Sequence, residues 1–188
     1  MVAGFETDPL PANGAIAMHA TLRITISRIT MLAFSILSLP AAAAEVPDAI
    51  AAPGEILVAT IHAAGAQIYE CKSDSAGRLG WQFREPIATL FLAGQTIGRH
   101  YAGPNWEMTD GSAVSGKVAG RAPAASASDI PLLKLEVSAR RGNGQLSDIS
   151  TIQRINTRGG VAEGACEQAG ALLSVPYTAD YTFYRKRG

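Results

Sequence analysis

The sequence predicts an all-β domain, an antiparallel sandwich or barrel of roughly eight to ten short strands, with a signal peptide before it. Short runs rich in β-branched and aromatic residues alternate between apolar and polar positions. Turn residues such as Gly, Asn, Asp and Pro recur between these runs, and no stretch with a helical period separates them. Strands that follow one another without helices pair as antiparallel neighbours, so an alternating β-α architecture is excluded.

The expected strands follow one another along the second part of the chain. The first runs are interrupted by Gly65, and the alternation is clearest from Leu133 to Ala139. Residues 140–144 (RRGNG) are typical of a hairpin turn, and residues 156–170 of a Gly-rich loop. The expected strands are residues 56–62, 66–72, 79–84, 89–92, 97–101, 114–119, 132–139, 149–157 and 172–184.

The composition excludes several classes of protein. Of 188 residues, 47% are hydrophobic, and 16 basic residues balance 16 acidic ones. An apolar fraction of this size with no net charge is typical of a globular domain and not of a disordered chain. Binding to nucleic acid through electrostatics needs a basic excess or stripe, which this chain lacks. No nucleic-acid partner is therefore predicted.

The segment from residue 18 to 44 has the order of a secretory signal peptide. Arg23 and Arg28 precede an uncharged apolar run, residues 29–39, and small residues at 42–44 fit the A-x-A cleavage rule. That run is too short to span a membrane, which takes about 20 apolar residues, so no transmembrane helix is expected in the mature chain. We therefore divide the chain into an unstructured extension or mis-assigned start (1–17), a signal peptide (18–44) and one β-domain (45–188), and expect a periplasmic or secreted protein.

Two cysteines, Cys71 and Cys166, lie in the part of the chain expected to be exported. In an oxidising compartment a single pair of this kind tends to be joined, so we expect one structural disulfide. A redox or metal-binding role is disfavoured because no C-x-x-C motif occurs.

The densest group of chemically capable residues is residues 99–107 (RHYAGPNWE), built around a Gly-Pro turn. His100 beside Glu107 suits a general base or a ligand-binding pair. The alternative is an aromatic corner, with Tyr101 and Trp106 in the core and His100 hydrogen-bonded. No ligand spacing supports a metal site, and no catalytic motif such as H-E-x-x-H or G-x-S-x-G occurs, so no metal or cofactor is predicted.

The last expected strand alternates through residues 175–184. Val175, Tyr177, Ala179, Tyr181 and Phe183 share one face, which is typical of a core strand. The opposite face carries Asp180 between two threonines. If that face lined a cavity, Asp180 would be a polar group directed into it.

Several stretches together resemble a known family: residues 65–71 (GAQIYEC), 81–83 (WQF), 85–91 (EPIATLF), 100–107 (HYAGPNWE), 110–112 (DGS), 153–160 (QRINTRGG) and 176–184 (PYTADYTFY). The chain is similar over about residues 46–185 to the secreted bacterial and fungal family catalogued as domain of unknown function 3455. The resemblance implies a single exported domain with cysteines placed as here, and no established activity. It draws attention to the residues of exposed type in residues 100–107 and 156–160. The candidate ligand-binding residues are thus His100, Tyr101, Trp106, Glu107, Arg154, Asn156 and Asp180.

Three functions remain open. The leading hypothesis is an exported β-domain that binds a small molecule or a component of the cell envelope. The second is a hydrolase that uses His100 with a nearby carboxylate such as Glu107 or Asp180. The third is a structural or stress-related envelope protein without a pocket.

Overall fold

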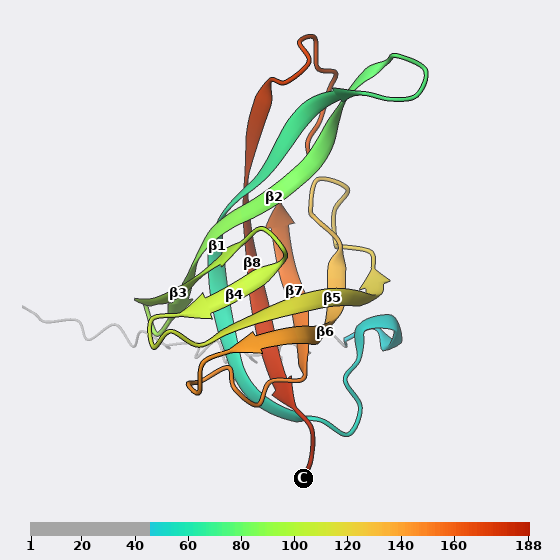
Figure 1. Ribbon diagram of the computed structural model, residues 1–188. Helices are drawn as coiled ribbons and strands as arrows, with labels where there is room; N and C mark the ends of the chain where they lie inside the picture. The colour runs from blue at the N-terminus through green and yellow to red at the C-terminus, as the bar shows by residue number, and fades with distance from the viewer. Residues whose placement is uncertain (1–45) are drawn as a thin grey trace, which may run out of the picture. The chain divides into compact units, whose positions relative to one another are not determined.

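The computed structural model describes residues 46–188, which form one antiparallel sheet of eight strands closed into a barrel (Figure 1). Each strand pairs with its neighbours in the sequence, and the last strand closes the barrel by pairing with the first. The predicted all-β antiparallel class is confirmed, and the barrel is the form that it takes. The expected extension and signal peptide lie outside the described residues. The strands are β1 (Ile56–Ser73), β2 (Leu79–Leu92), β3 (Gln95–Tyr101), β4 (Asn105–Met108), β5 (Ala113–Ala122), β6 (Leu132–Arg141), β7 (Thr151–Gly159) and β8 (Leu172–Arg185).

Two pairs of runs that were expected as separate strands are single long strands, β1 and β2. Gly65 does not end β1, because it pairs with Ala88 of β2 where the two neighbouring strands approach closely. A Cβ at Gly65 would lie 2.5 Å from the Cα and 2.7 Å from the Cβ of Ala88, which leaves room for glycine alone. The turn after β2 is where the sequence places it, and Ala93 and Gly94 both have positive φ, as a tight hairpin turn requires.

Alternation along the strands fills the barrel interior with apolar side chains. Leu133 and Leu135 of β6, Ile152 of β7, and Tyr181 and Phe183 of β8 are all buried in one hydrophobic cluster. The apolar face predicted for the last strand therefore points inward. Its other face, which carries Asp180, points out of the barrel.

A short segment before β1 packs against the outside of the barrel. It contains a single 3-10 turn, η1 (Asp48–Ile50), whose Ile50 is fully buried. Gln153 Nε2 donates to the Ile50 carbonyl at 2.6 Å, and Gln153 Oε1 accepts from the hydroxyls of Thr182 and Tyr184, both at 2.8 Å. The polar atoms of these outer-face side chains therefore have hydrogen-bond partners beneath the segment, as buried polar groups require.

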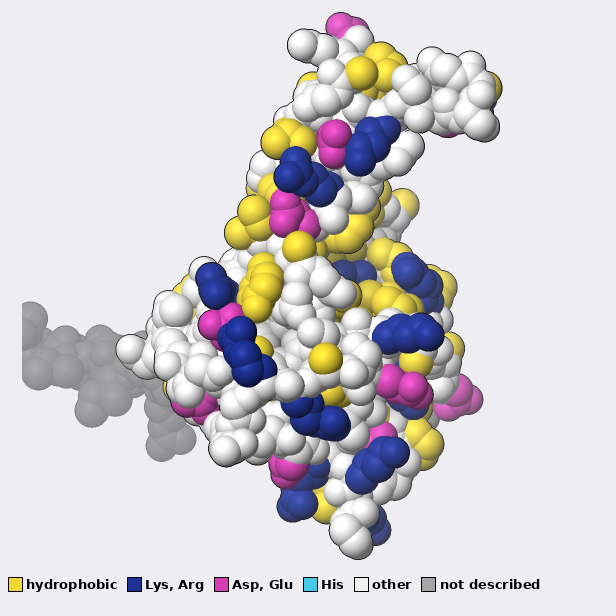
Figure 2. Space-filling view, viewed as in Figure 1, with side chains coloured by type: hydrophobic (Ala, Val, Ile, Leu, Met, Phe, Trp, Pro, Cys, Tyr) yellow, Lys and Arg dark blue, Asp and Glu magenta, His cyan; other side chains and the backbone are white. Residues whose placement is uncertain are grey.

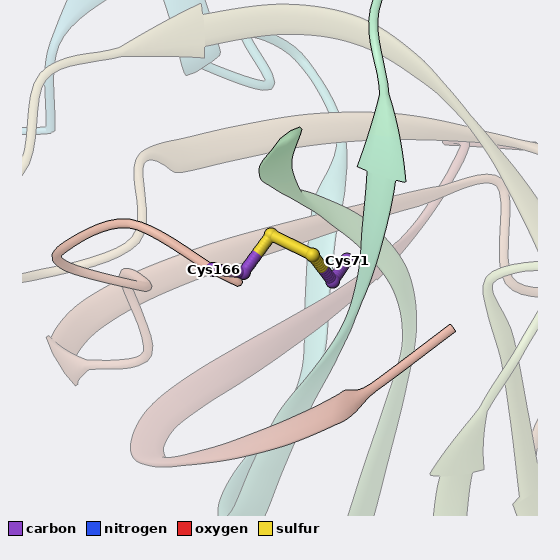
Figure 3. The surroundings of a disulfide bond; sticks show 2 residues. All are labelled: Cys71 and Cys166. Atoms are coloured by element: carbon purple, nitrogen blue, oxygen red, sulfur yellow. A yellow bond between two sulfur atoms is a disulfide. The ribbon is translucent and has the colours of Figure 1, made fainter. Parts of the chain in front are cut away.

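Cys71 and Cys166 form the predicted disulfide, with an S–S distance of 2.03 Å. Figure 3 shows the bridge between the far part of β1 and the loop that precedes β8. The two residues are 95 positions apart, so the bridge closes a loop that spans most of the domain. It tethers a long loop to the part of β1 that extends past the shorter strands.

Two local expectations are corrected. The Gly-rich loop begins later than expected, because Asn156 to Gly159 continue β7 and pair with β8 beyond an irregularity in the register. The run after the Gly103-Pro104 turn forms a strand of its own, β4, which pairs with β3 on one side and β5 on the other. Within residues 46–188, no helix combines the length and the apolar character needed to cross a membrane.

Candidate functional site

A cavity of about 610 Å³ opens into the barrel at the end where β1 and β2 outgrow their neighbours. Figure 2 shows hydrophobic and basic side chains next to each other on the face below the protruding ends of β1 and β2. Every strand contributes at least one residue to the walls, so the site is a concave interior and not a groove on one face. The lining residues are Gln67, Tyr69, Phe83, Arg84, Pro86, His100, Gly103, Pro104, Trp106, Val118, Arg121, Ile130, Pro131, Leu133, Leu135, Arg154 and Tyr181.

The inner end of the cavity is aromatic. His100 and Trp106 are direct partners in the β3–β4 register, and their rings stack with centroids 4.5 Å apart and planes inclined by 17°. Tyr181 of β8 reaches the same place, with its ring 5.0 Å from His100 and 5.2 Å from Trp106. All three side chains are buried. We call these three residues the aromatic floor.

His100 is neutral at ordinary pH. Burial lowers its pKa to about 4, and the charge of Arg154 lowers it further, against the raising effect of its bond to Asn105. The Nδ1 atom lies 2.8 Å from the carbonyl oxygen of Asn105, which can only accept, so Nδ1 carries the proton. The imidazole is thus a fixed, uncharged part of the floor.

Two polar atoms on side chains that line the cavity are themselves buried and have no hydrogen-bond partner within the described part of the chain. They are Nε1 of Trp106 and Nε2 of Gln67, on side chains that are 1% and 2% exposed. The opposite edge of the indole faces β5, where Cζ3 would lie 3.1 Å from a Cβ on Gly116, so the N–H edge points away from that wall. An unmade hydrogen bond at a buried donor costs about 1–3 kcal/mol, and a bound molecule with acceptor atoms would remove this cost.

Arg154 brings positive charge to the cavity. It lies on β7, opposite Tyr181 of β8 and Leu133 of β6 in the register. Its Nε and Nη2 atoms donate to the carbonyl of Pro131 at 3.1 and 2.8 Å, which fixes the guanidinium at the wall. Its charge also opposes the rise that burial causes in the pKa of Tyr181. Arg154 therefore adjoins the aromatic floor.

Tyr101 and Glu107, although adjacent in sequence to floor residues, lie on the outside of the barrel. Glu107 Oε2 accepts from Arg99 and Tyr101 at 3.1 and 3.0 Å and forms an ion pair with Arg141 at 3.1 Å. The bonds from Arg99 and Tyr101 lower the pKa of Glu107. Successive residues of a strand point to opposite faces, which separates this cluster from His100.

Asn156 and Asp180 also meet on the outside. His62 Nδ1 donates to Asp180 Oδ1 at 2.9 Å, and Asn156 Nδ2 donates to Asp180 Oδ2 at 2.8 Å. The face of β8 that carries Asp180 does not line the cavity, so the condition under which Asp180 would be directed into it is not met. Neither Asp180 nor Glu107 bonds to His100, so the acid/base pair expected for a hydrolase does not form.

Three of the candidate residues line the cavity: His100, Trp106 and Arg154. The other four lie on the outside of the barrel: Tyr101, Glu107, Asn156 and Asp180. The sequence reasoning missed Gln67 and treated Tyr181 only as core. A signal for Gln67 exists, because it shares one face of an alternating run with Tyr69 and Cys71. No cluster of three or more His, Cys, Asp or Glu side chains that could hold a metal ion occurs among residues 46–188.

A second hollow, of about 580 Å³, lies beside the C-terminal residues and is mostly polar. Its lining carries charges of both signs: the acidic residues are Glu55, Glu136 and Asp148, and the basic ones are Lys134, Arg140, Arg185, Lys186 and Arg187. Glu55 is already bonded to hydroxyls of the neighbouring loop and strand. This hollow has fewer features of a binding site than the aromatic cavity.

The fold and the site define a closed eight-stranded antiparallel barrel with an interior cavity, aromatic at its inner end and basic at its wall. The model of one protein family, described as "Protein of unknown function (DUF3455)", matches residues 52–185. The chain belongs to this family, as its sequence motifs predict. No curated protein and no solved structure matches the chain in these comparisons.

Proposed function

We propose that this protein is an exported binding protein that holds a small molecule in the barrel cavity. The observation that carries the proposal is the cavity inside the barrel, whose lining includes the aromatic floor and Arg154. Cavities of roughly 300–1,000 Å³ that are mainly apolar, with a few placed polar groups, are typical of small-molecule sites. A barrel of eight strands has an interior wide enough to hold one small ligand.

Export to the periplasm or the outside of the cell is part of the proposal. It is supported by the order of residues 18–44 and by the disulfide between Cys71 and Cys166, since such bridges persist in oxidising compartments. Of the two occupants expected from the sequence, a small molecule is favoured over an envelope component, because the polar donors lie inside the barrel.

The other two hypotheses lose support. A hydrolase would need a carboxylate within hydrogen-bond reach of His100 or one water away. Both candidates, Glu107 and Asp180, are bonded to other partners on the outer face. A purely structural protein would have no concave site near Trp106, whereas Trp106 lines the cavity.

The test uses Trp106 as its reporter. The chain has 2 tryptophans, so Trp81→Phe leaves Trp106 as the single emitter. Titration with the neutral apolar dye N-phenyl-1-naphthylamine should transfer energy from Trp106 to the dye and raise the unfolding temperature.

A pair of matched variants locates the dye. Val118 lines the cavity, whereas Val58 is exposed elsewhere and lines neither hollow. Val118→Trp should weaken dye binding at least tenfold, and Val58→Trp should leave it within twofold. Absence of saturable dye binding, or equal binding by both variants, would overturn the proposal.

A further inference from the structure

The charges around the cavity have one sign. Three arginines line it, Arg84, Arg121 and Arg154, and no Asp or Glu is among its lining residues in the part of the chain that the structure describes. Arg84 is offset by an ion pair with Glu85 at 3.2 Å. Arg154, by contrast, is held by a carbonyl, which leaves its charge uncompensated. A cavity of this kind favours an anion.

Three side chains that line the cavity carry hydrogen-bond donors. Nε1 of Trp106 can only donate, and the Nε2 amide of Gln67 is also a donor. A guanidinium has five N–H donors, of which Pro131 accepts two, so Arg154 has others to offer. A carboxylate accepts at about four positions and donates at none, so it is the complement of this set.

These donors lie close together. Arg154 and Trp106 both adjoin Tyr181, the first through the strand register and the second through ring contact. Gln67 and Ile130 both pack against Gly160, since a Cβ built there would lie 3.1 Å from the Gln67 side chain and 2.8 Å from that of Ile130. Ile130 directly precedes Pro131, whose carbonyl accepts from Arg154. All three donor side chains line the same cavity.

The mouth of the cavity carries apolar side chains beside Arg84 and Arg121. Phe83 is 55% exposed and Val118 is 36% exposed, although both line the cavity. The ring of Phe83 packs edge-on against Tyr69, with centroids 5.8 Å apart. Exposed apolar side chains at the rim of a cavity are typical of a place where an apolar ligand passes. The mouth therefore offers an apolar chain a surface to pass over, next to two exposed arginines.

We propose, resting on the proposed function, that the occupant of the cavity is an amphipathic carboxylate. Its carboxylate is bound inside, at Arg154, Gln67 and Trp106. Its apolar chain is directed outward past Val118 and Phe83. At neutral pH the floor itself adds no negative charge, because burial raises the pKa of Tyr181 and keeps its hydroxyl protonated. The arginines at the mouth, Arg84 and Arg121, attract the anion from solution.

The first experiment compares head groups on one chain. Decanoate, decanol and decyltrimethylammonium are titrated calorimetrically into the disulfide-bonded protein at pH 7. Decanoate should bind at least tenfold more tightly than decanol, and the cation should bind most weakly. If decanol or the cation binds as tightly as decanoate, the carboxylate proposal is overturned while the cavity still binds. If neither these compounds nor the neutral dye binds, the proposed function itself fails.

Variants then locate the head group. Arg154→Met should weaken decanoate at least tenfold and leave decanol and the neutral dye within threefold. Arg154→Lys should restore part of the loss, since it keeps the charge but not the planar fork. Arg158→Met is the matched control, because Arg158 lies on the same strand and is exposed outside the cavity. Equal decanoate affinity of the Arg154→Met and Arg158→Met proteins would overturn the assignment to Arg154.

The direction of the chain is tested by heavy-atom quenching in the Trp81→Phe protein, which needs no change at Arg154. The analogue 2-bromodecanoate carries bromine beside the carboxylate, and 10-bromodecanoate carries it at the far end. At saturation the 2-bromo compound should quench Trp106 more strongly. Stronger quenching by the 10-bromo compound would place the carboxylate at the mouth and overturn the proposed orientation.

Discussion

His100 stacks on Trp106 with ring centroids 4.5 Å apart, and both side chains are almost fully buried, at 3% and 1% exposure. Stacking of this kind contributes roughly 0.5–1.5 kcal/mol beyond the burial of area. It holds only while the imidazole is uncharged, because a buried charge without a counter-ion is costly. The pair therefore makes the aromatic floor sensitive to pH.

The first prediction concerns this sensitivity. The pKa of His100 is about 4 in the folded protein and about 6.5 in the unfolded chain. Between these values the unfolded chain binds a proton that the folded protein does not, so stability falls as the pH is lowered from 6.5 to 4 and is unaffected by this group above 6.5. The loss approaches about 3 kcal/mol, at about 1.4 kcal/mol for each pKa unit.

The measurement is urea unfolding of wild type and His100→Phe at intervals from pH 7.5 to 4. Phe keeps a ring on Trp106 and cannot bind the proton, although it loses the bond to Asn105. The difference in unfolding free energy between the two proteins should shrink as the pH falls. A difference that stays constant over this range would show that His100 does not cause the effect.

The second prediction concerns the disulfide. Replacing both Cys71 and Cys166 by Ala should lower the free energy of unfolding by roughly 2–5 kcal/mol, because the unfolded chain regains the freedom that the bridge removes. Oxidised wild type, reduced wild type and the double variant are compared by urea denaturation. The reduced protein and the double variant should agree closely. An unchanged midpoint would mean that the bridge does not stabilise the barrel.

The third prediction concerns the close pairing of β1 with β2 at Gly65. Gly65→Ala should destabilise the barrel by about 1–3 kcal/mol, because its methyl group would overlap the backbone at Ala88. Gly80→Ala is the matched control on β2, where a Cβ would meet nothing within 4 Å. That control should change stability by less than about 0.5 kcal/mol. Equal effects of the two substitutions on the thermal midpoint would contradict the packing argument.

The contrast between Gly65 and Gly80 also shows what the sequence could and could not predict. Alternation identified the strands and which residues share a face, because the period of a strand is local. It did not show that Gly65 lies inside one long strand, since the reason is a contact with Ala88, distant in sequence. The disulfide was predictable because only Cys71 and Cys166 can pair.

The candidate site divides in the same way. His100 and Trp106 were found because they belong to a dense aromatic cluster, and Arg154 through its family motif. The sequence left open whether the face with Asp180 lines a cavity, because that is decided by the pairing of β8 with β1 and β7. The role of Gln67 depends on closure of the barrel, which brings β1 near the residues that follow β7.

The last prediction separates the inner and outer faces of the barrel by their effect on ligand binding. Glu107 and Asp180 lie outside, bonded to Arg99 and His62 respectively, so Glu107→Gln and Asp180→Asn should leave the affinity for the neutral dye and for decanoate within twofold. Because its bonds to Arg99 and Tyr101 lower the pKa of Glu107, its contribution to stability should be present at neutral pH and be lost as the pH falls below its ordinary value of 4.5. Trp106→Phe, which keeps an aromatic ring but removes the N–H, should weaken decanoate severalfold by removing one donor. Calorimetric titration of the three variants at pH 7 checks this, and the division of roles fails if an outer-face substitution weakens decanoate as much as Trp106→Phe does.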